Sequence, residues 1–414
     1  MNILITGVAG YSHLVPFVLP AASALRDSGH RVTIAVPDAG VDLVTEYGFE
    51  ALPLRGVPEL REIVTDPALR ADDFTVTGYA PPASLPPIGG SLPTSSVLLS
   101  ARAFIGVLAH RAATALLDAL GDTVPDLILR DNTEFGGHLV AEKLGCREAV
   151  LDVAPMLDER APELLAVLNE VRRAHDLPEV AEPPSAPRIA QTPLDFYPPG
   201  RPVEHVHCFR PGPRTHAPLD AAIADLPADG PLVLASLGSV APRIGIGGVL
   251  LDRIVQALGA LDVRAVVAVG SHPVPNPPAN VVVTDFVDQQ TILSTCDVFI
   301  SHGGFNGVRE SLQAGVPAVL LPLFGDHPGN SAQVERLGAG IALDPATASA
   351  EEIASATTKI LADPAYRRNA QRFARRTQAL PDLSAFPASL AEPSTRYAEA
   401  RLGSFQPGRG KWQV

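Results

Sequence analysis

Short apolar runs alternate with helix-like stretches along this chain, and the alternation starts again halfway. The first-half runs are 2–6, 31–36, 126–130 and 147–153, and the helical patterns between them lie near 14–28, 39–47 and 133–145. Strands buried on both faces read as continuous apolar runs, and strand–helix alternation is typical of a parallel, doubly wound sheet. The pattern therefore predicts an α/β fold.

The second half repeats this architecture. Its apolar runs are 231–238, 264–270, 280–286, 297–304 and 317–323, with helical patterns near 246–259, 305–314 and 328–337. A proline-rich stretch, 178–218, separates the halves, so the boundary is expected near 208–218. We predict two doubly wound, Rossmann-like domains facing across a cleft, at 1–210 and 211–385. We expect a C-terminal helix, 386–403, to pack back on the first domain, and 404–414 to form a disordered tail.

The length of the chain supports this division. A chain of 414 residues exceeds a single core of ordinary size, and 46% hydrophobic residues provide enough material for two cores. Residues 78–95 are rich in proline, glycine and serine, which predicts a long loop. A loop of this length in a compact domain is usually a lid or a binding loop.

Charge and cysteine usage exclude several classes of protein. The formal net charge is −13 and no long basic run exists, which argues against nucleic acid and anionic membranes as partners. Cys146, Cys208 and Cys296 are too widely spaced for a disulfide framework or a metal site, and they suit a reducing compartment. The sequence contains no stretch of about 18 apolar residues, the length needed to span a bilayer, and residues 1–6 do not resemble a secretory signal. A cytoplasmic protein is expected.

The segment Ser301-His302-Gly303-Gly304 ends a predicted strand and opens a predicted helix. Glycines permit close approach of the backbone, and a helix N-terminus offers free N–H groups and a partial positive charge, which suit a phosphate. His302 and Asn306 add donors, and Glu310 can accept from the hydroxyls of a nucleoside. The residues alone leave open a plain strand-to-helix turn with a buried histidine.

The wider context resembles the donor-binding block of family 1 glycosyltransferases, especially bacterial enzymes that glycosylate natural products. SHGGFNGVRE followed by GVPAVLLPLFGDHPGNSAQVERLGAGIAL places the family's motif residues at the right spacing: His302, Gly304, Glu310, Gly315, Pro317, Asp326 and Asn330. The resemblance covers essentially the whole chain. It implies the GT-B fold, with an acceptor-binding first domain and a nucleotide-sugar-binding second domain.

The resemblance also implies further donor contacts. DFVDQQTIL (285–293) is similar to the family's aromatic-x-Pro-Gln segment, with Phe286 and the backbone of Val287 at the base, Gln289 in the Gln place and Asp288 in place of Pro. SLGS (236–239) brings Ser239 to a phosphate. Asp326 and His327 stand where donor-sugar hydroxyls are read, although His327 replaces the more usual Gln and an ordinary surface-loop histidine stays open there. The donor contacts implied are Ser239, Phe286, Val287, Gln289, His302, Gly303, Gly304, Asn306, Gly307, Glu310, Asp326 and His327.

The segment after the first strand, GVAGYSHLVPF, is not a dinucleotide fingerprint, because Ala9 and Ser12 stand where glycines are required. It resembles the family's Gly-His-x-x-Pro, with His13 and Pro16 in register and Ser12 in place of Gly. The resemblance implies that His13 is the catalytic base, a role that suits a group with a pKa near 7.

A histidine base works best beside a carboxylate, and the resemblance points to Asp131 at the end of strand 126–130. The residues alone leave two alternatives open, a helix N-terminal histidine without chemistry and an aspartate that caps helix 133–145. Glu134 is a second choice for the supporting acid.

The sequence thus predicts an inverting, metal-independent glycosyltransferase. It would move a sugar from a thymidine or uridine diphosphate sugar to a hydroxyl of an apolar natural-product aglycone, such as a polyketide, in antibiotic biosynthesis. No cofactor besides the donor substrate is expected. His205 and His207 do not show the ligand spacing of a zinc site, and no Asp-x-Asp motif is present.

The acceptor would contact loop 55–100 and the helical stretch 158–175. A nucleotide-sugar epimerase of the same fold and a catalytically silent helper subunit are the alternatives. Dimerisation and dependence on a helper protein stay open.

Overall fold

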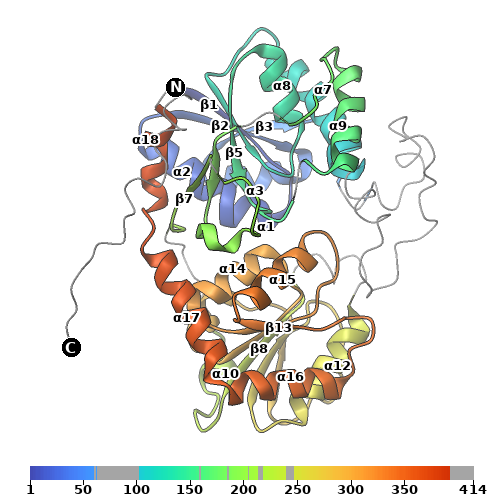
Figure 1. Ribbon diagram of the computed structural model, residues 1–414, viewed down its shortest axis with the longest axis vertical. Coiled ribbons are helices and arrows are strands. Elements are labelled where there is room, and N and C mark those ends of the chain that lie inside the picture. Colours follow the sequence, from blue (N-terminus) through green and yellow to red (C-terminus); the bar gives the residue numbers. More distant parts are fainter. Residues whose placement is uncertain are drawn as a thin grey trace.

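The computed structural model describes residues 1–59, 62, 102–157, 160–183, 186–203, 205–212, 218–238 and 247–391. These residues form two parallel sheets flanked by helices, one above the other in Figure 1. The predicted α/β architecture with two doubly wound sheets is confirmed. The last strand of the first sheet ends at Cys208 and the first strand of the second begins at Leu232, on either side of the predicted boundary.

The first sheet has seven strands in the order β3-β2-β1-β4-β5-β6-β7, all paired in parallel. The strands are β1 (Asn2–Thr6), β2 (Arg31–Pro37), β3 (Glu50–Leu54), β4 (Leu127–Asp131), β5 (Arg147–Asp152), β6 (Arg188–Ala190) and β7 (Val206–Cys208). The helical elements of this half are α1 (Tyr11–His13), η1 (Leu14–Val18), α2 (Leu19–Asp27), η2 (Asp38–Gly40), α3 (Val41–Glu46), η3 (Arg102–Leu108), α7 (Ala109–Leu120), α8 (Gly136–Leu144), α9 (Pro162–Ala174) and η4 (Leu194–Phe196).

The second sheet has six strands in the order β10-β9-β8-β11-β12-β13, again all parallel. The strands are β8 (Leu232–Ser236), β9 (Arg264–Ala268), β10 (Val281–Thr284), β11 (Val298–Ser301), β12 (Ala318–Leu320) and β13 (Gly340–Ala342). The helices of this half are α10 (Ala221–Ala224), α12 (Gly248–Gly259), α13 (Gln289–Leu293), α14 (Phe305–Ala314), α15 (His327–Arg336), α16 (Ala350–Ala362) and α17 (Pro364–Gln378), followed by η5 (Leu383–Ala385) and α18 (Phe386–Ala391).

Local chemistry explains where these helices begin and end. α14 follows the extended residue Gly304 and ends at Gly315, whose φ of 71° is the left-handed conformation that glycine tolerates best. α16 begins with a capping box between Ser349 and Glu352. The helix predicted at 133–145 begins only at Gly136, because the side chains before it hold the chain in a turn. Asn132 donates to Asp152, Thr133 donates to Asp131, and Glu134 accepts from the Gly136 N–H.

An aromatic cluster joins the two halves. The ring of Phe17, from η1, stacks on that of Phe305, from α14, with centroids 5.9 Å apart. Phe196 packs on Phe305 at 5.4 Å and on Phe373 of α17 at 6.2 Å. All four side chains are buried. This contact fixes the helices of the lower sheet against those of the upper one.

The chain returns to the first sheet near its end. α17 runs along the lower half, and α18 lies beside the N-terminus of the chain (Figure 1). α18 and η5 pack on α2, and Arg147 donates to the Leu390 carbonyl. The remainder of the predicted C-terminal helix, the tail 404–414 and most of the loop 55–100 lie outside the described residues.

Candidate active site

Both sheets reverse their strand order at a point that faces the other half. In the first sheet the reversal lies between β1 and β4, and in the second between β8 and β11. Open parallel sheets bind ligands beyond the carboxyl ends of the strands at such points. His13 follows β1 and Asp131 ends β4, while Gly238 follows β8 and His302 follows β11. The topology thus gathers the candidate residues of each half at one crevice.

His13 and Asp131 are in contact. Nδ1 of His13 lies 2.6 Å from Oδ2 of Asp131, whose carboxylate is fully buried, while the His13 side chain keeps 24% exposure. An ionised carboxylate only accepts, so Nδ1 carries the proton and Nε2 keeps a free lone pair. Burial lowers the pKa of His13, but the charge and hydrogen bond of Asp131, together with the charge of Asp326, raise it above 6.5 overall. This arrangement can accept a proton near neutral pH.

The backbone around His13 departs from a regular helix. His13 ends the short turn α1, and the next residues form a π-helix that contains Pro16. Proline has no N–H to give to a helix, and single π-turns absorb such interruptions. His13 therefore sits at a local irregularity that turns it toward Asp131.

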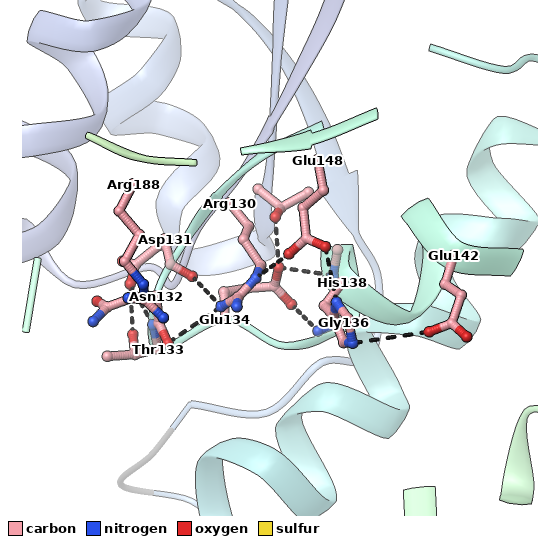
Figure 2. Close-up of polar contacts among 12 residues, drawn as sticks. Arg130, Asp131, Asn132, Thr133, Glu134, Gly136, His138, Glu142, Glu148 and Arg188 are labelled. Atoms are coloured by element: carbon pink, nitrogen blue, oxygen red, sulfur yellow. Dashed lines mark hydrogen bonds and ion pairs between the residues drawn. The ribbon is translucent and has the colours of Figure 1, made fainter. Parts of the chain in front are cut away.

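The second oxygen of Asp131 is held by its own loop. Oδ1 accepts from the backbone N–H and the hydroxyl of Thr133, both at 2.8 Å (Figure 2). The neighbouring Arg130 side chain donates to Glu148 at 2.6 Å and to the Asn132 carbonyl at 3.3 Å. Both oxygens of the Asp131 carboxylate are thus held, Oδ2 by His13 and Oδ1 by Thr133.

Glu134, the second choice for the supporting acid, is engaged elsewhere. Its oxygens accept from the Thr6 hydroxyl at 2.5 Å and from the N–H groups of Gly136 at 2.6 Å and Gly137 at 2.9 Å. These are the first N–H groups of α8, so Glu134 satisfies the start of this helix, the role that was the alternative for Asp131. Burial raises the pKa of Glu134, although its hydrogen bonds and Arg130 act in the opposite direction.

Asp326 faces His13 from the other half. It precedes α15, and Oδ2 accepts from Asn330 at 2.9 Å. Burial raises the pKa of Asp326, while the Asn330 hydrogen bond and the charge of His13 lower it. Because each group acts on the pKa of the other, the predicted sugar-reading position and the predicted base position lie on the two sides of one site.

His302 fills a space that only glycines leave. A Cβ at position 304 would come within 2.5 Å of Nε2, and one at position 238 within 2.7 Å. Nδ1 is buried and forms no hydrogen bond of ordinary geometry to the described residues. Burial lowers the pKa of His302 to about 4, although the Ser236 backbone acts in the opposite direction. His302 is therefore neutral at pH 7 and can offer an N–H donor, but not a positive charge.

His327 is not the surface-loop histidine that was left open. It is 6% exposed, and its ring meets that of His302 edge-on at 4.6 Å and that of Phe324 at 4.5 Å. Its Nδ1 accepts from the Phe324 N–H at 3.3 Å. Burial and the proximity of His302 lower its pKa well below 6.5. His327 is thus a neutral, buried neighbour of His302.

Three amides converge on Glu310. Its oxygens accept from Gln289 at 2.7 Å, Gln290 at 2.8 Å and Asn306 at 3.1 Å, and the residue is 5% exposed. Asp288, which replaces the family's proline, accepts from the Thr291 N–H at 3.1 Å and caps α13. The segment that carries Gln289 is therefore held by a helix cap.

The other predicted donor residues differ in their exposure and contacts. Phe286 is 70% exposed, and Val287 packs against the core. Gly303 has a φ of 80° and accepts a hydrogen bond from Asn330 at 3.0 Å. A Cβ at position 307 would lie 3.4 Å from Phe299 and Ser301 of β11, an ordinary contact distance. Ser239 lies outside the described residues. Their roles in binding stay predictions.

Three residues near the site were not singled out from the sequence. Gln290 shares Glu310, Met156 from the loop after β5 touches Gly329 of α15, and Arg309 reaches from α14 into the first half. A polar residue three positions after Asn306 on one helix is the only local signal for Arg309. Contacts across the two halves carry no such signal.

In the part of the chain that the structure describes, no three side chains of His, Cys, Asp or Glu come together as a metal-binding group. None of the helices in this part of the chain combines the length and apolar character needed to cross a membrane.

Comparison with known proteins places the chain among sugar transferases. Residues 252–391 match the family model described as "Erythromycin biosynthesis protein CIII-like, C-terminal domain". The chain is 26% identical over 400 residues to the tylactone mycaminosyltransferase of Streptomyces fradiae, covering 89% of this chain and 87% of that protein. It is 28% identical over 425 residues to the aclacinomycin-T 2-deoxy-L-fucose transferase of Streptomyces galilaeus, with 91% and 92% covered.

Solved structures share the fold. The spinosyn rhamnosyltransferase SpnG, complexed with thymidine diphosphate, matches with a TM-score of 0.75 at 19% identity, covering 95% of this chain and all of that one (100%). The glycosyltransferase SnogD from Streptomyces nogalater matches with a TM-score of 0.70 at 22% identity, covering 94% and 99%. The chain is therefore a glycosyltransferase of the GT-B fold, similar to bacterial enzymes that glycosylate natural products.

Proposed function

We propose that this glycosyltransferase moves a sugar from a thymidine or uridine diphosphate sugar to a hydroxyl of an apolar, polyketide-like aglycone, as a step of antibiotic biosynthesis. The observation that carries the proposal is the His13–Asp131 pair, which faces Asp326 of the nucleotide-sugar half. A base and a sugar-reading acid on opposite sides of one crevice suit a transfer reaction.

The reaction is a direct displacement with inversion at the anomeric carbon. Nε2 of His13 takes the proton of the acceptor hydroxyl while that oxygen forms a bond to the anomeric carbon. The bond from this carbon to the diphosphate breaks, and the nucleoside diphosphate leaves with the electron pair. Asp131 holds Nδ1–H and stabilises the imidazolium that forms.

The departing diphosphate would meet the start of α14. The first N–H groups of this helix are free of intrahelical partners, and the helix dipole adds a partial positive charge. His302 would add a neutral N–H donor. We propose that no metal and no cofactor take part, and that these donors stabilise the leaving group instead.

The names of the relatives support the substrate class. Tylactone, 10-deoxymethynolide and erythronolide are the acceptors in the names of three transferases that match along most of this chain, at 26–27% identity. The titles of two similar structures name thymidine diphosphate, and we extend that ligand to this chain. Met156 and α9 would contribute to the acceptor side.

A panel assay tests the proposal. Thymidine and uridine diphosphate sugars are combined with macrolactone and aromatic polyketide aglycones, and products are identified by mass spectrometry. We expect donor consumption only when an aglycone is present, full activity in EDTA, and the opposite anomer in the product by NMR coupling. Donor conversion without an aglycone would instead support the epimerase, and donor binding without turnover the silent helper subunit.

A further inference from the structure

Arg309 is buried at the contact between the two halves of the enzyme. It lies on α14 next to Glu310 and is only 1% exposed. Buried arginines are rare, and their guanidinium donors need partners. One amino group donates to Gln191, in the loop after β6, at 2.8 Å, and the other donates to Asn306 at 2.9 Å. The side chain thus binds both halves at once.

Toward the first half, the guanidinium lies over the ring of Phe17, 4.4 Å from its centroid. Phe17 is four residues after His13, in the π-helix that continues from the histidine. An arginine plane over an aromatic face is an attractive contact that strengthens when water is excluded. A displacement of α14 would therefore be transmitted to the segment that carries His13.

Toward the nucleotide-sugar half, Arg309 sets the orientation of Asn306. A guanidinium only donates, so it selects the carbonyl oxygen of the Asn306 amide. The amide nitrogen then points to Glu310 at 3.1 Å. Asn306 lies on the first turn of the helix expected to bind the diphosphate. One cation therefore orients a donor-site amide and stacks on the base-bearing segment.

We propose that Arg309 is a positioning residue that couples occupation of the donor site to the placement of His13. The inference rests on the proposed function, because it assigns the diphosphate to α14 and the base role to His13. Lysine cannot replace Arg309, because a single ammonium group cannot bind Gln191 and Asn306 and also contact the ring of Phe17.

The test combines kinetics with NMR of the His13 ring. We compare wild type with Arg309→Met, Arg309→Lys and Phe17→Leu, measuring kcat, donor KM and the pH titration of His13 with and without thymidine diphosphate. The His13 signal is assigned by its loss in His13→Asn. We expect Arg309→Met to lower kcat at least 10-fold, raise donor KM, and abolish most of the response of His13 to thymidine diphosphate, with little rescue by lysine. Phe17→Leu should lower kcat and leave donor KM within two-fold.

Arg172 provides the matched control. It is a fully buried arginine held by Glu142, at 2.6 and 2.7 Å, within the first half. Arg172→Met should lower the melting temperature but keep donor KM and the His13 response unchanged. A purely structural Arg309 would behave the same way, and that result would overturn the inference. The wild-type enzyme could instead show no turnover while thymidine diphosphate still changes the His13 titration and Arg309→Met abolishes that change. This result would refute the transfer reaction and leave the coupling intact.

Discussion

Nδ1 of His13 lies 2.6 Å from Oδ2 of Asp131, and Thr133 holds the other oxygen of the same carboxylate. This order fixes which nitrogen of the histidine is protonated and leaves Nε2 for the acceptor. The charge of Asp326, in the opposite half, also raises the pKa of His13. The chemistry assigned to the site depends on these two acidic neighbours acting from different sides.

Removal of the base should stop turnover but not binding. We expect His13→Ala to lose about 10²–10⁴ in kcat, because a positioned general base contributes about that much. Nucleoside diphosphate should bind as in wild type, since the donor residues lie in the other half. Steady-state kinetics and titration calorimetry measure the two quantities. Unchanged kcat in this variant would refute the base assignment.

Asp131→Asn should move the pH profile as well as the rate. Only the neutral form of His13 is a base, so kcat/KM falls on the acid side as the ring is protonated. Asp131 raises the pKa of His13, so its replacement lowers that pKa and shifts the acid limb to lower pH. Glu134→Gln is the control. It weakens the cap of α8, because glutamine keeps only one of the two acceptor oxygens, and it should lower stability while leaving the acid limb in place.

Gly304→Ala should displace His302. The added carbon would lie 2.5 Å from Nε2, closer than real contacts allow, so the ring must turn away. We expect weaker binding of nucleoside diphosphate, measured by calorimetry, with the fold retained. Gly230→Ala is the control in the same half, because the added carbon would meet only the Asp262 carbonyl oxygen, at 3.9 Å, and Gly230 is not a predicted donor contact. Equal loss in both variants would contradict the crowding argument.

Acid should destabilise the protein partly through His302. Its pKa is about 4 in the folded protein and near its ordinary 6.5 in the unfolded chain, so the unfolded state binds more protons between these values. Stability therefore falls as pH drops from about 6.5 to 4. His302→Asn should flatten this dependence in urea unfolding at several pH values. An identical slope in wild type and variant would place the lowered pKa in doubt.

Asp326→Asn should weaken binding of the nucleotide sugar more than binding of the nucleoside diphosphate alone. If this carboxylate accepts from sugar hydroxyls, the lost charged hydrogen bond is equivalent to about 1.5 kcal/mol or more, which is about 10-fold in donor KM. Nucleoside diphosphate alone should bind with unchanged affinity. The acid limb of kcat/KM should also move to lower pH, since Asp326 raises the pKa of His13. Equal weakening of nucleotide and nucleotide sugar would assign Asp326 to the nucleotide instead.

The range of α14 was predictable because the residues that begin and end it can be recognised in the sequence. Glycines bracket α14 at positions 304 and 315, and its predicted range, 305–314, agrees with the structure. β3 was missed because it contains Pro53 and lies at the edge of the sheet, where proline is tolerated. β6 and β7 have three residues each, too few for a pattern within a proline-rich stretch.

The site divides in the same way. Motif spacing was enough to bring His13 near Asp131, because both follow strands that are neighbours in the sheet. The buried state of His327 results from its packing against His302 and Phe324, and the reach of Arg309 depends on how the two halves pack. No local pattern in the sequence reports either contact. The neutrality of His302 likewise results from burial rather than from its neighbours in sequence.

The two connections between the halves run side by side. Arg210 and Asp382 form an isolated parallel bridge, with Arg210 N–H bound to the Pro381 carbonyl at 2.7 Å and the Leu383 N–H bound to the Arg210 carbonyl at 3.0 Å. An ion pair between the two side chains, at 3.0 Å, reinforces it. Two crossings tied together act as a pivot rather than as two separate tethers. Opening of the enzyme to admit a bulky acceptor would therefore be a rotation about this point, with the largest displacement at the cleft edge farthest from it.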